Sequence, residues 1–134
     1  MKTILIIVIF AALTGNAQLA VSISALKVSG QKTVVPLVMQ NHFNQKIESA
    51  RASVFLLDER GKMVGQSTKW VIGGEKTSPS LAPNATNAFN FVITSDKPLS
   101  KTNLTARVVF NRIVFADGKL GDPAKDVKIE NDKE

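Results

Sequence analysis

The most regular pattern in the chain is the alternation of apolar and polar residues between positions 47 and 72. Such alternation is typical of half-buried β-strands. Asp58 to Lys62 forms a polar interruption, with Gly61 where a left-handed residue costs least. We therefore predict a long β-hairpin whose first strand runs through the core. On that strand, four small or aliphatic residues share the face against which an opposite sheet packs: Ala50, Ala52, Val54 and Leu56.

Shorter segments with the same period surround this hairpin. Strands are predicted over residues 20–28, 33–39, 88–94, 104–115 and 127–129. Pro36 has no N–H to donate, so strand 33–39 is expected at a sheet edge or bulged at that point. The run 104–115 is expected to break or bulge near Asn111 and Arg112. No helix is expected after residue 17, because no stretch there keeps a helical period over three turns.

The number and spacing of these strands indicate the fold class. Six to eight short strands, about 8 to 15 residues apart, with a long crossover at 73–87, are typical of an all-β, immunoglobulin-like β-sandwich of about 7 strands. The Cys-Trp-Cys signature of antibody domains is absent, since the chain has no cysteine. A small closed barrel is the alternative architecture.

The first residues have the pattern of an export signal. Lys2 precedes an unbroken apolar run from Ile4 to Leu13, and small residues follow up to Ala17. The apolar run is shorter than the roughly 20 residues of a membrane-spanning helix. We therefore predict a cleaved signal peptide (1–17), a β-sandwich domain (18–128) and a polar C-terminal tail (129–134). The released protein is expected to be secreted or periplasmic, with no membrane span.

Charge is spread along the chain. The 17 Lys and Arg residues exceed the 11 Asp and Glu residues, but the basic residues stand singly between apolar neighbours. This spacing favours solvated sheet faces over a nucleic-acid or anionic-polymer surface, because clustering is what makes a binding patch. No nucleic-acid partner is expected.

One stretch has a family resemblance. The run VFLLDERGKMVG at Val54 to Gly65 resembles the FxLYD family, short secreted or surface-attached bacterial domains of immunoglobulin-like fold. Leu56, Asp58, Gly61 and Val64 fit the family pattern, whereas Val54 stands where the family has Phe and Leu57 where it has Tyr. Leu-Ala-Pro-Asn at 81–84, followed by Phe-Asn-Phe at 89–91, is similar to the family's second motif, with Asn in place of Gly. The resemblance implies a non-catalytic module with a binding role.

Two candidate sites stand out among the side chains. Trp70, the single tryptophan, is a candidate platform for a sugar or peptide, because tryptophan is enriched where binding energy concentrates; the alternative is a ring that covers the open end of the core. Met39 and His42 are a weaker candidate copper site, since thioether and imidazole suit Cu(I). A surface histidine beside a core methionine is the simpler interpretation. No cofactor is expected.

The same inventory argues against an enzyme. With one histidine and no cysteine, a nucleophile-base pair would have to use His42. Most acidic residues fall in predicted turns, where Asp has a structural role. The expected function is an exported, non-catalytic β-sandwich that binds another macromolecule, a protein or an envelope polysaccharide. The triplets at Asn84 and Asn103 match the N-glycosylation pattern, which carries no weight in a bacterium.

Overall fold

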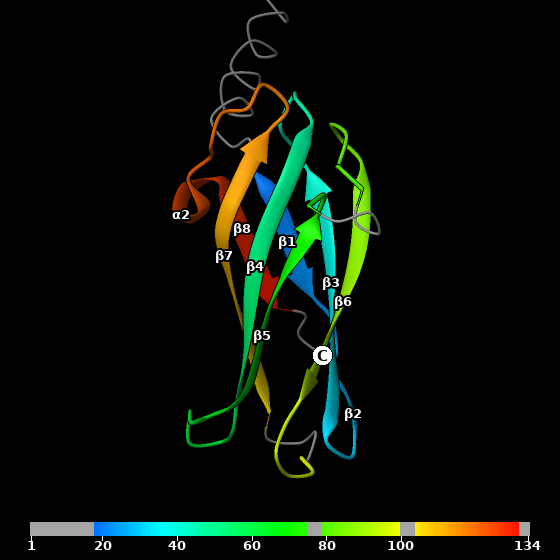
Figure 1. Cartoon of the computed structure of the whole chain (residues 1–134), viewed down its shortest axis with the longest axis vertical. Helices are drawn as coiled ribbons and strands as arrows, with labels where there is room; N and C mark the ends of the chain where they lie inside the picture. The colour runs from blue at the N-terminus through cyan, green and yellow to red at the C-terminus, as the bar shows by residue number, and fades with distance from the viewer. Residues whose placement is uncertain (1–17, 75–78, 100–103, 132–134) are drawn as a thin grey trace, which may run out of the picture.

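The computed structural model describes residues 18–74, 79–99 and 104–131 (Figure 1). The predicted signal peptide and Asn103 therefore lie outside the described residues. Within these ranges the chain forms eight strands and one short helix: β1 (Leu19–Ile23), β2 (Lys27–Ser29), β3 (Lys32–Asn41), β4 (Ile47–Leu57), β5 (Met63–Ile72), β6 (Thr86–Thr94), β7 (Thr105–Phe115), α2 (Pro123–Asp126) and β8 (Val127–Asn131).

The strands make two sheets that pack face to face, which confirms the predicted all-β sandwich (Figure 1). In the five-stranded sheet, β3 pairs with β6 on one side and with β1 and then β2 on the other. Strand β8 runs parallel to β1 and forms the far edge. In the three-stranded sheet, β4 lies between β5 and β7, both antiparallel to it.

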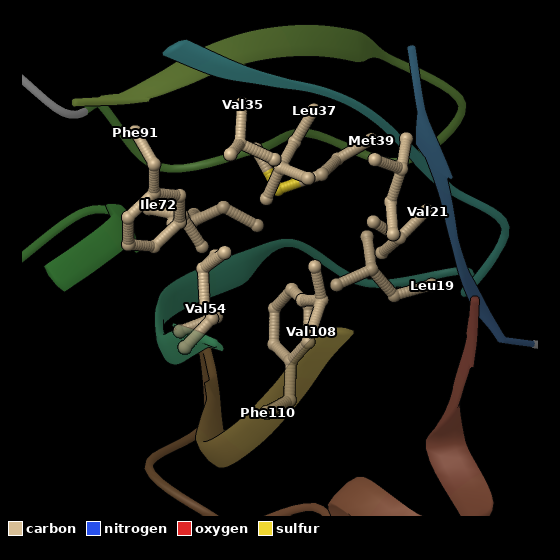
Figure 2. Close-up of a cluster of buried hydrophobic side chains, with 14 of the residues drawn as sticks. Leu19, Val21, Val35, Leu37, Met39, Val54, Ile72, Phe91, Val108 and Phe110 are labelled. Atoms are coloured by element: carbon tan, nitrogen blue, oxygen red, sulfur yellow. The ribbon is translucent and has the colours of Figure 1, made fainter. Parts of the chain in front are cut away.

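Strand β4 is the centre of the three-stranded sheet, as its alternation predicts. The four residues expected on its inner face, Ala50, Ala52, Val54 and Leu56, are all buried. Figure 2 shows Val54 of β4 and Val108 of β7 facing Val35 and Leu37 of β3, with Phe91 of β6 beside them. Gly61 in the turn has a φ of 80°, so the predicted β4–β5 hairpin is confirmed.

The prediction that Pro36 marks a sheet edge or a bulge is wrong, because β3 has partners on both sides. The neighbouring strand is interrupted instead: β1 pairs with β3 only as far as Leu37, β2 pairs with it only from Val34 onward, and residues 24–26 between β1 and β2 belong to no strand. The Ser24 N–H donates to the Pro36 carbonyl at 3.0 Å. Backbone groups of one residue point to the same neighbour in an antiparallel ladder, so the proline ring faces the gap, where no ladder bond is lost.

Buried Asn41, at the end of β3, joins three segments of the chain. Its side-chain amide donates to the carbonyls of Gln45 and Leu81, each at 3.0 Å, and its Oδ1 accepts from the Phe43 N–H at 2.8 Å. Leu81 also forms an isolated bridge with Ile47. One side chain therefore ties the turn after β3 to the crossover between the two sheets.

The two long sides of the sandwich close differently. On the β5 and β6 side the sheets touch: a Cβ added at Gly65 would lie 2.9 Å from Ile93 Cγ2, so a larger residue at position 65 would force the Ile93 side chain or the strands to shift. On the β7 and β8 side, α2 contacts both strands near the top of Figure 1, at the upper end of β7. Among the described residues, no element covers the lower part of that side, so the described part of the sandwich is open there.

Three local features differ from the sequence expectations. The predicted first strand is split into β1 and β2. A short helix, α2, is present where none was expected; Asp122 caps it by accepting the Ala124 N–H, and Pro123 occupies its first turn, the residue order that favours a helix start. Strand β8 continues to Asn131, past the expected end of the sandwich at residue 128.

Candidate functional site

The open side of the sandwich holds an apolar groove of about 240 Å³. It lies between the end of β4, the lower half of β7, strand β1 and the edge strand β8. Of its lining residues only arginine is charged: Ile23, Leu57, Thr105, Ala106, Arg107, Val108 and Ile129. Ala106 and Val108 point into the sandwich and keep 8% and 7% of their surface exposed, so the groove gives access to the rim of the core.

The backbone beside this groove is an open sheet edge. Near its end, β7 is bonded on its outer side, where Gly121 N–H donates to the Ile113 carbonyl at 2.8 Å and Phe115 N–H to the Lys119 carbonyl at 2.9 Å. Over Thr105–Phe110, β7 pairs with β4 alone among the described residues. Alternate N–H and C=O groups of this segment therefore point away from the sheet, as on any edge strand.

Groove and edge together make a site for an extended chain. A strand laid beside β7 would meet unpaired backbone groups, and every second side chain would point toward the groove. The sequence did not reveal this site, because the alternation of β7 predicts which residues face inward but not which strand is missing beside them. The small side chain of Ala106 is the only local signal.

The structure places Trp70 on the outer surface of the three-stranded sheet, half-buried and directly across from exposed Arg51. Gly74, with a φ of 77°, packs against the indole: a Cβ added there would lie 2.5 Å from its ring atoms. The ring therefore faces away from the core, held against the backbone of the turn. Its role in binding stays a prediction.

The structure does not bring the two candidate copper ligands onto one surface. Met39 is fully buried among the side chains between the sheets (Figure 2), whereas His42 is exposed after the end of β3. The His42 backbone N–H donates to the Gln18 carbonyl at 3.0 Å. Within residues 18–74, 79–99 and 104–131, no three His, Asp or Glu side chains gather as metal ligands would.

The carboxylate with a shifted pKa has a structural role. The Lys62 backbone N–H donates to Asp58 Oδ1 at 2.9 Å and holds the pKa of Asp58 below its usual value, and the Arg60 N–H, also at 2.9 Å, lowers it further; partial desolvation opposes both. These bonds close the β4–β5 turn. Asp58 is thus the turn former that the sequence predicts.

Comparisons with known proteins inform the fold only. No family model matches the chain, and no curated protein matches it significantly. The X-ray structure of Northeast Structural Genomics Consortium target SoR45 is similar, with a TM-score of 0.50 and 14% identity over 79% of this chain and 77% of that chain. A β-glucuronidase from glycoside hydrolase family 2 gives a TM-score of 0.44 and 13% identity over 75% of this chain but 11% of the enzyme. In the described part of the chain, no helix is long and apolar enough to cross a membrane.

Proposed function

We propose that the protein is an exported, non-catalytic β-sandwich that binds an extended segment of another protein along the open edge of β7. The observation that carries this proposal is the apolar groove beside Thr105–Phe110, where the backbone edge and the rim of the core are accessible together. Backbone pairing would supply affinity, and the groove would select the side chains. Export rests on the signal pattern of the first 17 residues.

The lining defines the partner's chemistry. Aliphatic side chains dominate the groove, so alternate residues of the bound segment are expected to be Val, Ile or Leu. Arg107 is the one charge beside it, so an acidic residue is favoured at an intervening position. The partner is therefore an extended segment that alternates apolar residues with polar or acidic ones.

The test uses a nine-residue peptide with valine at alternate positions and Thr or Glu between them. A matched peptide carries the same side chains but is N-methylated at every second backbone nitrogen, which removes the donors on one edge. Isothermal titration is expected to show binding of the first peptide and at least a tenfold loss with the second. Equal affinity for both, or no binding of either, would refute strand addition.

A pair of variants locates the binding. Ala106→Leu adds three carbon atoms and fills the groove, whereas the control Val109→Leu adds one carbon atom on the opposite face of the same strand, where Val109 is 39% exposed. We expect Ala106→Leu to weaken peptide binding at least tenfold and Val109→Leu to change it less than twofold. If both variants bind like the unmodified protein, the groove is not the site.

A further inference from the structure

The outer surface of the three-stranded sheet carries basic and aromatic side chains on strand segments that contain no acidic residue. Residues 51–57, 63–70 and 105–112, which make up most of its three strands, contain no Asp or Glu. Among the described residues, Asp58 lies in the β4–β5 turn at one end of this surface, and the Glu48 carboxylate of β4 lies 3.7 Å from the Lys46 ammonium group. We name the surface the arginine face, defined by Arg51, Phe55, Trp70, Arg107 and Arg112.

Strand register gathers these residues from distant parts of the chain. On β4, Arg51 lies across from Trp70 of β5 and from Arg112 of β7. Phe55, four residues farther along β4, lies across from Arg107. The two rows are thus about 13 Å apart along the strand. The basic residues look dispersed in the sequence, but the sheet places three arginines on one surface.

The pairing of Arg51 with Arg112 is unfavourable in the protein by itself. Like charges directly opposite each other on neighbouring strands destabilise a sheet, and no acidic residue of the three strand segments offsets this pair. Both guanidinium groups are on exposed residues. An anion bound between them would remove the repulsion, and guanidinium groups bind carboxylates through two parallel hydrogen bonds.

Hydroxyl and amide groups occupy the space between the two rows. Ser53 is 8% exposed, and its Oγ forms a hydrogen bond of 2.8 Å with Thr68 Oγ1. The Ser53 hydroxyl also donates to Asn111 Oδ1 at 3.2 Å. Thr68 and Asn111 are exposed and keep further hydrogen-bonding capacity. The centre of the arginine face therefore offers hydroxyl and amide groups to a ligand, beside Val109, which lies across from Ser53.

The arrangement of these groups points to one class of ligand. We propose that the arginine face binds an acidic polysaccharide whose carboxylates meet the arginines, with sugar hydroxyls over Thr68 and Asn111 and a sugar ring near Trp70. Exposed apolar side chains at this surface, Val109 and Met63, lie on β7 and β5, with half-buried Phe55 and Leu57 on β4 between them, so the arginines and hydroxyl groups, rather than apolar area, favour a polysaccharide. The face shares only Arg107 with the β7 groove.

The test is affinity electrophoresis of the purified protein in gels containing polygalacturonate, alginate or hyaluronate, with neutral dextran as reference. Arg51→Gln combined with Arg112→Gln removes two charges without touching the groove. The control, Lys27→Gln combined with Lys32→Gln, removes two exposed charges from the five-stranded sheet. We expect at least one acidic polysaccharide, but not dextran, to retard the unmodified protein. The arginine double variant is expected to lose affinity for that polysaccharide tenfold or more, and the lysine double variant less than twofold.

Several outcomes would overturn the proposal. Equal losses of affinity in the two double variants would mean diffuse charge attraction. The proposal would also fail if none of the three acidic polymers retarded the protein, or if polyglutamate or DNA bound more tightly than all three. Trp70→Ala is expected to weaken the retardation further, and unchanged retardation would remove the indole from the site. The Arg51→Gln, Arg112→Gln variant leaves the groove intact, so its affinity for the valine peptide is expected to stay within twofold of that of the unmodified protein. This measurement separates the test of the arginine face from the test of the groove.

Discussion

Replacing Asn41 by alanine tests whether one buried side chain holds the crossover to the body of the sandwich. The change removes three hydrogen bonds, to the carbonyls of Gln45 and Leu81 and from the N–H of Phe43. Each such bond contributes about 1 kcal/mol net, and partners left buried without one cost more. We therefore expect the free energy of unfolding to fall by about 3 kcal/mol.

The assay is urea unfolding followed by the fluorescence of Trp70, the single tryptophan. The midpoint is expected to fall with an unchanged slope, because the surface exposed on unfolding stays the same. Asn90→Ala, at an exposed asparagine of β6, is the matched control and is expected to change stability by less than about 0.5 kcal/mol. A loss at Asn41 no larger than that at Asn90 would refute the reasoning.

Asn41→Asp adds a pH signature to the same site. A carboxylate cannot donate to the two carbonyls and would be desolvated, so its pKa in the folded protein is expected above the unfolded value of about 3.9. Stability of this variant should then be highest below pH 4 and be lost as pH rises through the raised pKa. A variant whose stability relative to the unmodified protein is the same at pH 4 and pH 7 would contradict this.

Three further predictions follow from local geometry. Thr33 Oγ1 is buried with no hydrogen-bond partner, so Thr33→Val should raise the free energy of unfolding by about 1 kcal/mol; a loss in calorimetry would show that the hydroxyl is satisfied. The lowered pKa of Asp58 means that its stabilisation is present above the unfolded pKa of about 3.9 and is lost as pH falls through the folded value; an NMR titration of Asp58 with a midpoint above 3.9 would contradict this. Gly74→Ala should cost about 1 to 3 kcal/mol and shift the emission of Trp70, since the glycine has a φ of 77° and the new Cβ would meet the indole; unchanged emission and stability would show that the turn relaxes freely.

Local sequence patterns predict the strands, whereas the environment of Pro36 and the candidate sites depend on how the strands pair. The alternation of residues predicts β4 and its inner face, and Gly61 predicts the turn that follows. Both features depend only on residues close together in the sequence. Pro36 was misplaced because its tolerance depends on a break in a neighbouring strand, which no local signal in β3 reports. The parallel pairing of β8 with β1 joins the two ends of the described chain.

The candidate sites were hidden for the same reason. Arg51 and Arg112 are far apart in the sequence and meet only through the register of β4 and β7. The groove beside Ala106 exists because the sheets close along β5 and β6 and stay open along β7 and β8. Trp70 was identified from residue type alone, but its neighbours on the arginine face were not.

Amide hydrogen exchange along Thr105–Phe110, measured by NMR with and without the valine peptide, tests the proposed function most directly. In the free protein, amides bonded to β4 should be protected, and the alternate amides at the outer edge of β7 should exchange quickly. Saturating peptide is expected to slow the second set at least tenfold. An outer edge already protected in the free protein, or one that stays unprotected with peptide bound, would contradict strand addition at β7.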